Sequence, residues 1–252
     1  QIADKFNTLQ MGMVAVDRIF SIFENDSTII DTGEISKASF KGEIKFKNVK
    51  FSYIPNTEVL KGVSFNLNPG ETLAIVGPTG SGKTTIINLI SRLYEIENGE
   101  ITIDDIPINN YKLNSLRDNI GVILQDVFLF ADTIQNNVTL FDDSISKDQV
   151  VRAAKDLGIH EFIMSLPDNY NFNVQERGNT LSAGQKQLIA FMRVLIKNPD
   201  ILILDEATSS IDSYSEDLIK TATKKITKNK TSIIIAHRLS TIESASTIIY
   251  ME

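Results

Sequence analysis

The residues of this chain with the clearest chemical meaning lie in one short loop, at positions 77–84. Its sequence, Gly-Pro-Thr-Gly-Ser-Gly-Lys-Thr, has the spacing of two glycines, a lysine and a hydroxyl residue that is typical of phosphate-binding loops. Glycines at these positions let the backbone curl around a polyphosphate, and the N-terminus of the following helix binds its charge. We expect the Lys83 ammonium to bind the β- and γ-phosphates and the Thr84 hydroxyl to bind Mg²⁺.

The segments on either side of the loop separate this interpretation from a glycine-rich turn that carries a lysine by chance. Residues 72–76 form an apolar run that predicts a buried strand, and residues 85–90 have the pattern of a helix start. A strand, then the loop, then a helix is the setting in which such a loop holds phosphate. The sequence therefore predicts a site for a nucleoside triphosphate.

Two adjacent carboxylates, Asp205 and Glu206, follow an apolar run at 201–204 that predicts another buried strand. Ligands of open α/β sheets bind at the carboxyl ends of the strands. We expect Asp205 to hold Mg²⁺, as strand-borne aspartates do beside phosphate loops, and Glu206 to take the proton of an attacking water. The alternative is a pair of solvated carboxylates at a strand end, and the phosphate loop upstream favours the catalytic hypothesis.

The composition limits the classes of protein to which the chain can belong. Its 252 residues, 42% hydrophobic and 23% charged, are ordinary for one large or two small globular domains. A net charge of −7 argues against a general nucleic-acid surface, and the basic pair Lys224 and Lys225 is typical of a solvated helix face. The chain has no cysteine, which excludes disulfides. It also has no apolar run that is nearly long enough to span a bilayer.

Residues 1–24 differ from the rest, because apolar side chains recur there with alternating spacings of four and three, as in a heptad seam. The seam consists of Ile2, Phe6, Leu9, Met13, Val16, Phe20 and Phe23. Such a helix packs either on its own domain or within a bundle whose other members lie elsewhere. The polar segment 25–41 predicts a linker. The chain opens on Gln1 and ends within an apolar stretch, which indicates a piece of a longer polypeptide, truncated at its C-terminus.

From residue 42 to residue 252 the pattern predicts a mixed α/β domain. The expected strands cover residues 43–49, 58–66, 72–76, 102–103, 121–123, 201–204 and 232–236. Helical periodicity covers residues 127–198, with turn signals at Gly158, Pro167 and Pro199. Fully apolar strands that alternate with helices favour a mainly parallel sheet.

Residues 181–187, Leu-Ser-Ala-Gly-Gln-Lys-Gln, form a small polar turn that opens a predicted helix, which is physically an anion site. Together with the phosphate loop and the paired carboxylates, this segment resembles the signature of ATP-binding cassette (ABC) proteins. The resemblance implies a P-loop NTPase core with a mainly parallel sheet, an antiparallel β subdomain and a helical signature subdomain. It also implies that ATP is sandwiched between two subunits, with the signature on the partner's γ-phosphate. The signature residues are Leu181, Ser182, Ala183, Gly184 and Gln185.

Four further positions match the family in the order that it uses. By resemblance, Tyr53 stacks on adenine, and Gln125 contacts Mg²⁺ and water and senses a membrane domain. Asp212 matches the loop that reaches across the dimer, and His237 matches the histidine that holds the γ-phosphate. The implied catalytic residues are Glu206, His237 and Gln125, and the implied Mg²⁺ ligands are Thr84, Gln125 and Asp205. The implied nucleotide-binding residues are Tyr53, Gly77, Pro78, Thr79, Gly80, Ser81, Gly82, Lys83, Thr84 and Thr85.

Two stretches outside these motifs indicate the subfamily. Residues 115–134 look like exporter cassettes, and so do residues 174–178, which in exporters face the intracellular loops. In this resemblance residues 1–24 are the cytosolic end of the last transmembrane helix, which favours the bundle interpretation of the seam. The resemblance implies an ATPase that uses ATP and Mg²⁺ to power export of an unknown substrate at the cytoplasmic face of the cell (inner) membrane. The implied partners are a second nucleotide-binding domain and a transmembrane domain of the same polypeptide, without nucleic acid.

Ala183 departs from the family pattern, which usually has glycine there, and a methyl group at a close approach of backbone to phosphate would weaken the partner's site. A heterodimer with one weak site and a homodimer that tolerates alanine both stay open. A soluble cassette ATPase of DNA repair or translation is a second hypothesis, disfavoured by the acidic charge and the exporter-like stretches. A nucleotide-binding regulatory module without turnover is a third, disfavoured by the presence of Lys83, Gln125, Glu206 and His237.

Overall fold

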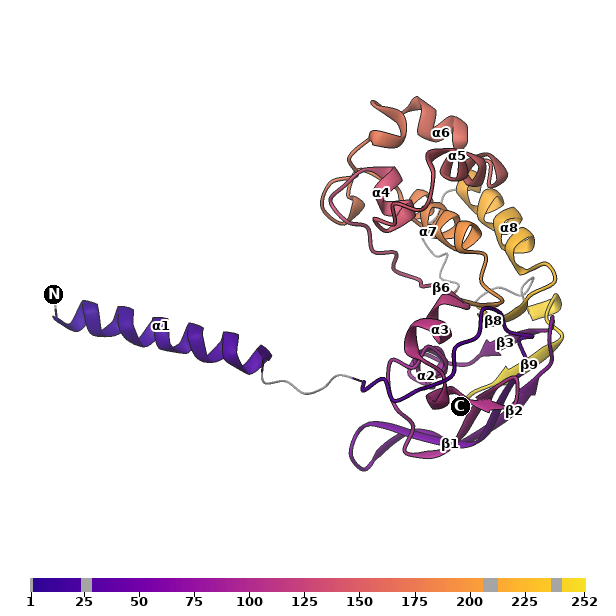
Figure 1. Ribbon diagram of the computed structural model, residues 1–252, viewed down its shortest axis with the longest axis horizontal. Helices are drawn as coiled ribbons and strands as arrows, with labels where there is room; N and C mark the ends of the chain where they lie inside the picture. The colour runs from indigo at the N-terminus through magenta and orange to yellow at the C-terminus, as the bar shows by residue number, and fades with distance from the viewer. Residues whose placement is uncertain (1, 24–28, 206–212, 237–241) are drawn as a thin grey trace. The chain divides into compact units, whose positions relative to one another are not determined.

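The computed structural model describes residues 2–23, 29–205, 213–236 and 242–252 (Figure 1). It divides into two compact units, Gln1–Asp31 and Thr32–Glu252, each of which is described here by itself.

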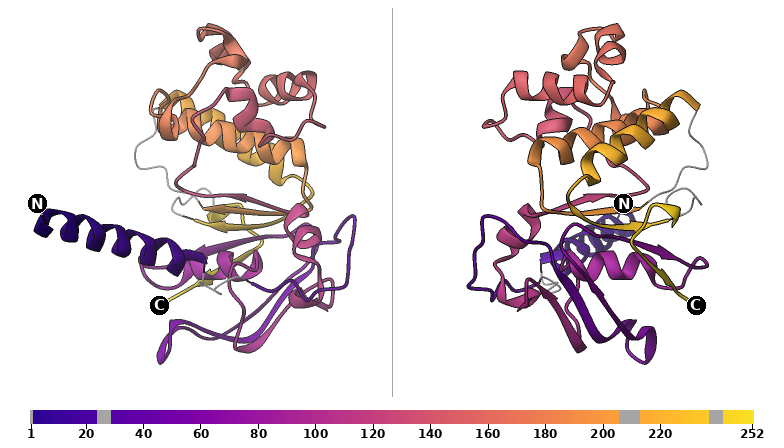
Figure 2. Two further views of the ribbon diagram at one scale, coloured as in Figure 1. Left: turned by 60° about the vertical axis from the view of Figure 1, so that its left-hand side comes forward. Right: turned by 90° about the vertical axis from the view of Figure 1, so that its right-hand side faces the viewer.

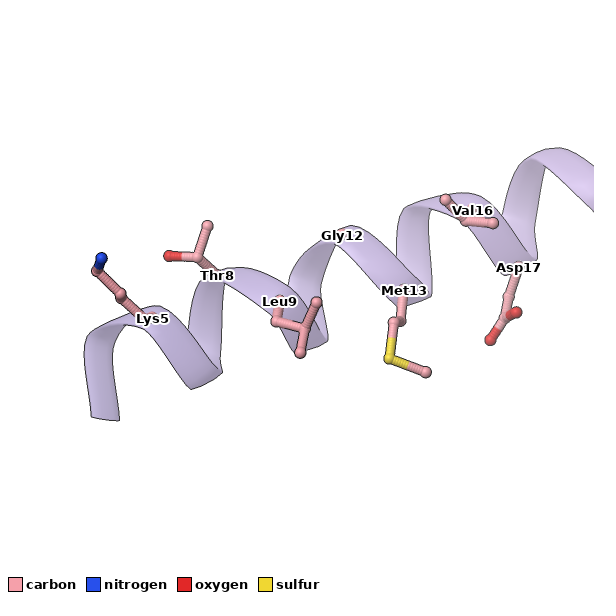
Figure 3. Close-up of a pocket in the computed structure, with 7 residues that line it drawn as sticks. All are labelled: Lys5, Thr8, Leu9, Gly12, Met13, Val16 and Asp17. Atoms are coloured by element: carbon pink, nitrogen blue, oxygen red, sulfur yellow. The ribbon is translucent and has the colours of Figure 1, made fainter. Parts of the chain in front are cut away.

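The first unit consists mainly of helix α1 (Ile2–Phe23), as the heptad spacing predicts. The large apolar side chains that the structure describes on this helix are exposed, among them Phe6 at 63% and Leu9 at 62%. A shallow groove runs along this helix, and Figure 3 shows that a single helix supplies all of its lining residues. These are Lys5, Thr8, Leu9, Gly12, Met13, Val16 and Asp17. Within the described residues, no helix is both long and apolar enough to cross a membrane.

The second unit is built on a five-stranded sheet in the order β6-β7-β8-β3-β9, and every pairing in it is parallel. The strands are β3 (Thr72–Val76), β6 (Ile120–Ile123), β7 (Ile201–Asp205), β8 (Thr231–Ile235) and β9 (Thr247–Tyr250). All residues of β7 and β8 are buried, as their apolar sequences require of strands covered on both faces. The expected parallel sheet is therefore confirmed.

A second, antiparallel sheet has the order β2-β1-β4-β5. Its strands are β1 (Ile44–Ile54), β2 (Thr57–Leu67), β4 (Asn98–Ile103) and β5 (Ile106–Pro107). Phe46 and Phe65 stack across the β1–β2 pair with their ring centroids 4.4 Å apart. Buried residues of this sheet share one apolar core with β3 and with helix α2 (Lys83–Ile90). The expected antiparallel subdomain is present.

The helices that follow β6 form a separate apolar core. They are α4 (Ile134–Thr139), α5 (Lys147–Asp156), α6 (His160–Ser165), α7 (Ala183–Lys197) and α8 (Ser213–Thr227). Both views in Figure 2 place these helices on one side of the parallel sheet and the antiparallel sheet on the other. Helix α7 contacts α4, α5, α8 and β6, so it joins the helical region to the sheet.

Residues 32–41 lie on the second unit and are hydrogen-bonded to it. The backbone N–H of Ile35 donates to the Asn110 carbonyl, and that of Phe40 donates to the Asp200 carboxylate at 2.7 Å. A side chain at Gly33 would collide with the Tyr111 carbonyl, so glycine allows this close approach. Helix α3 (Leu113–Asp118), which the sequence did not indicate, helps to anchor this segment. The assignment of residues 25–41 as a linker stays a prediction.

Candidate functional site

The predicted phosphate loop connects β3 to α2, as its flanking sequences require. Gly82 caps α2 with φ of 93°, a left-handed conformation that favours glycine. A Cβ at Gly77 would collide with the carbonyl oxygen of Met251, which follows the edge strand β9. The loop backbone therefore follows a path that glycine adopts readily and in which other residues would be strained.

Two side chains of the loop fit a polyphosphate. Lys83, the first residue of α2, is 8% exposed, and its ammonium donates to the carbonyls of Gly77 at 2.9 Å and Pro78 at 2.8 Å. The Ser81 hydroxyl is buried without a hydrogen-bond partner, which is costly for a polar atom unless a ligand completes it. A buried cation and an unsatisfied hydroxyl within one loop are the donors that phosphate oxygens need.

A cleft of about 420 Å³ brings several of the predicted residues together from separate elements, whereas Gly77, Pro78 and Ser81 of the loop do not line it. It is lined by Tyr53, Val59, Thr79, Gly80, Gly82, Lys83, Thr84, Thr85, Gln125, Asp205 and Ile235. The cleft thus unites the aromatic residue at the end of β1, the phosphate loop and two strand ends. Val59 and Ile235 were not among the expected residues, because an apolar position in a strand gives no sign that it borders a ligand site.

The sheet topology explains why Gln125 and Asp205 meet in this cleft. Ile123 pairs with Leu204 across β6 and β7, so the two polar residues leave neighbouring parallel strands at the same edge. Asp205 is 9% exposed and pairs in turn with Ile235 of β8. Gln125 and Asp205 therefore line the same cleft as the phosphate loop, and their roles there stay predictions.

The donors in the cleft fit Mg²⁺, which prefers oxygen ligands and is usually held by one or two carboxylates together with substrate phosphates. Thr84 offers a hydroxyl, Gln125 an amide oxygen and Asp205 a carboxylate. Across the part of the chain that the structure describes, no three His, Cys, Asp or Glu side chains gather into a metal site. Thr84, Gln125 and Asp205 would supply three oxygen ligands to a bound Mg²⁺, and substrate phosphates are its usual further ligands.

The signature residues do not line this cleft. Ser182 caps α7 through a capping box, in which its hydroxyl accepts from the Gln185 N–H at 3.2 Å and its own N–H donates to the Gln185 side chain at 2.9 Å. Ser182 and Ala183 are exposed at the start of α7, whereas Gly184 is buried and Leu181 belongs to the helical core. The signature is therefore a surface helix N-terminus separate from the chain's own phosphate loop.

Hydrogen bonds hold the segment that follows Gln125 to helix α7. The guanidinium of Arg193 donates to the Asn137 carbonyl at 2.7 Å and to the Phe128 carbonyl at 3.1 Å, and burial lowers the pKa of Arg193. Asn137 is fully buried and bonds the backbone of Phe130 in both directions. Movement of this segment would therefore be passed to the signature helix.

Glu206, Asp212 and His237, to which the sequence assigns the catalytic base, the cross-dimer loop and the γ-phosphate contact, lie outside the described residues. Their roles stay predictions.

Comparisons with known proteins point to one family. The family model for ABC transporters matches residues 60–209. An uncharacterized ABC transporter ATP-binding protein, YknV of Bacillus subtilis, is 45% identical over the whole chain, which covers 42% of that protein. An ATP-dependent lipid A-core flippase of Saccharophagus degradans is 42% identical over 98% of the chain and 42% of its own length. A bacterial Atm1-family ABC exporter, solved with ATP bound, superimposes with a TM-score of 0.85 at 38% identity, over 98% of this chain and 43% of the exporter.

The fold and site define an ATP-binding cassette of the P-loop NTPase class. The chain belongs to the ABC transporter family, as an ATP-binding domain with exporter-type relatives. Domains of this family bind ATP and hydrolyse it to power transport. The chain spans less than half the length of the relatives that it matches.

Proposed function

We propose that this chain is the ATP-hydrolysing domain of an exporter, and that ATP and Mg²⁺ bind in the cleft between Tyr53 and Asp205. The observation that carries the proposal is that a single cleft joins an aromatic ring, a phosphate loop and the side chains of Gln125 and Asp205. Nothing in a glycine-rich turn alone would require this convergence.

In this proposal, different residues bind different parts of the nucleotide. Tyr53 stacks on the base, the loop N–H groups and Lys83 bind the β- and γ-phosphates, and Thr84, Gln125 and Asp205 hold Mg²⁺. Mg²⁺ supplies charge neutralisation on the phosphate oxygens when it is bound. Glu206 takes the proton of the attacking water, and His237 holds the γ-phosphate.

The proposal includes a second nucleotide-binding domain, and it is supported by the start of α7, which is exposed and lies outside the chain's own cleft. In the proposed dimer, Ser182 and its neighbours meet the γ-phosphate bound by the partner, and Asp212 reaches across the interface. ATP binding closes this dimer, and hydrolysis reopens it, which is a two-state cycle biased by the ligand.

The exporter assignment is supported by relatives that combine ATP-binding and permease parts, of which this chain matches less than half. We propose that a transmembrane domain of the same polypeptide carries the substrate path and holds this domain at the cytoplasmic face of the membrane. The substrate itself would bind in that domain, so no residue of this chain identifies it.

The test is phosphate release from Mg²⁺-ATP by the wild-type chain and by Glu206→Gln, with size-exclusion chromatography of both. Glutamine keeps the shape of the side chain but cannot accept the proton, so turnover should fall by about two orders of magnitude or more. ATP binding should survive, and the ATP-bound dimer should accumulate. Near-normal turnover by Glu206→Gln would refute the catalytic assignment, and a wild-type chain that binds ATP but releases no phosphate would favour a regulatory module.

A further inference from the structure

Three aromatic rings form a cluster beside the cleft, and the nucleotide motifs account for only one of them. The ring centroid of Tyr53 lies 4.8 Å from that of Phe51 and 4.9 Å from that of Tyr94, with the ring planes at 89° and 85°. Phe51 and Tyr94 lie 5.7 Å apart. Each ring therefore meets the other two edge to face, an arrangement that aromatic pairs prefer.

Of the three rings, only that of Tyr53 lines the cleft. Phe51 is buried in the core, at 5% exposed, whereas Tyr94 and Tyr53 are each 44% exposed. Phe51 and Tyr94 therefore support the Tyr53 ring from outside the cleft. The surface of Tyr53 that faces the cleft is left open for a planar ligand.

The hydroxyl of Tyr53 is tied to the helix that carries the phosphate-binding lysine. It donates to the Thr85 hydroxyl at 3.2 Å and accepts from the Asn88 amide at 3.0 Å. Thr85 and Asn88 are three residues apart on α2, so both lie on the same face of this helix. Lys83 is the first residue of α2, so this one helix positions both the Lys83 side chain and the hydroxyl end of the Tyr53 ring.

We propose that Asn88 and Tyr94 are positioning residues for the nucleobase, which hold the Tyr53 ring at a fixed angle and at a fixed place relative to the phosphate loop. The inference rests on the proposed stacking of adenine on Tyr53. Neither residue lines the cleft, so each acts through Tyr53 and not by touching the nucleotide. Their loss weakens recognition of the base and leaves recognition of the triphosphate intact.

The size of the effect follows from the contacts that each substitution removes. Without its supports, the Tyr53 ring gains rotamer freedom that ATP binding must then remove. Tyr94→Ala deletes one edge-to-face pair with Tyr53, so the Kd for ATP should rise about 3- to 10-fold. Asn88→Ala deletes one neutral hydrogen bond, so it should raise the Kd for ATP about 2- to 5-fold. Tyr53→Phe deletes two, to Thr85 and to Asn88, so it should raise the Kd about 4- to 25-fold.

The experiment is titration calorimetry of the full chain with Mg²⁺-ATP and, separately, with Mg²⁺-tripolyphosphate, which has no base. Tyr94→Ala and Asn88→Ala should weaken binding of ATP and leave the Kd for tripolyphosphate unchanged. Tyr94→Phe keeps the ring and should bind ATP like the wild type. The matched control is Phe141→Ala, since Phe141 is an exposed ring in an edge-to-face pair with Phe130 at 5.6 Å and does not line the cleft.

A double-mutant cycle distinguishes positioning from direct contact with the base. In a Tyr53→Ala background, Tyr94→Ala should cause no further loss of ATP affinity. If Tyr53→Ala weakens ATP binding but Tyr94→Ala and Asn88→Ala do not, the inference fails and the proposed function stands. An equal loss for ATP and for tripolyphosphate would also overturn it, because that result indicates a general distortion of the site. Unchanged ATP affinity in Tyr53→Ala would refute the adenine contact itself and, with it, the inference.

Discussion

Replacing Lys83 by methionine removes the ammonium and keeps most of the apolar stem, so it isolates the charge that the phosphate loop depends on. The ammonium already donates to the Gly77 and Pro78 carbonyls, at 2.9 and 2.8 Å. Binding of ATP therefore exchanges two hydrogen bonds to neutral oxygens for two to phosphate oxygens.

The expected loss of ATP affinity in Lys83→Met follows from this exchange of hydrogen bonds. Hydrogen bonds that involve a charged group contribute roughly 1.5 to 3 kcal/mol, and we assign the lower value to each ammonium–carbonyl bond and the upper value to each ammonium–phosphate bond. Two such exchanges give a net of about 3 kcal/mol, which corresponds to a Kd for ATP that is roughly 100-fold higher in Lys83→Met. An estimate that ignored the two carbonyls would predict a larger loss.

The assay is titration calorimetry with Mg²⁺-ATP, and Lys61→Met serves as the control, because Lys61 is an exposed lysine on β2 that does not line the cleft. The control should bind ATP like the wild type. A Kd for Lys83→Met within about threefold of the wild-type value would refute the assignment of this lysine to the β- and γ-phosphates.

Two further predictions concern the signature and the helical core. In a heterodimer whose partner lacks the glutamate that matches Glu206, Ala183→Gly should leave total turnover of the transporter nearly unchanged. In a homodimer, the same substitution should raise or maintain turnover. Sequencing of the partner and assay of a purified single gene product distinguish the heterodimer from the homodimer. Burial raises the pKa of Tyr170 to about 12, so its stabilising contribution is fully present below about pH 10 and is lost as the pH rises toward 12. Tyr170→Phe should flatten the fall of the free energy of unfolding in denaturant titrations over that range, and an unchanged slope would contradict this.

The parts of the site that local spacing determines could be predicted from the sequence. The loop at 77–84 needs its glycines within a few residues of one another, and the strand and helix beside it carry their own apolar patterns. The apolar run at 201–204 predicts that Asp205 follows a strand at the ligand-binding edge of the sheet, whereas Gln125 is expected in the site only from the family resemblance. The pairing of Ile123 with Leu204 explains why the two residues meet.

The parts that depend on contacts distant in sequence could not be predicted. The strand order β6-β7-β8-β3-β9 places β8 between β7 and β3, and no local pattern encodes that neighbour. The proposed positioning role of Tyr94 and Asn88 depends on their contacts with Tyr53, which is 35 residues from Asn88 in the sequence. The docking of residues 32–41 depends on the close approach of Gly33 to Tyr111, which a polar, glycine-containing segment does not reveal.

The central claim is that ATP binds with its base on Tyr53 and its phosphates on the loop, and that the signature of a second subunit completes the site. A crystal structure of the Glu206→Gln chain with ATP and Mg²⁺ tests this most directly. The account predicts adenine against Tyr53, the β- and γ-phosphates on Lys83, and Ser182 of the second subunit beside the γ-phosphate. ATP bound outside the cleft, or an ATP-bound dimer joined away from Ser182, would contradict it.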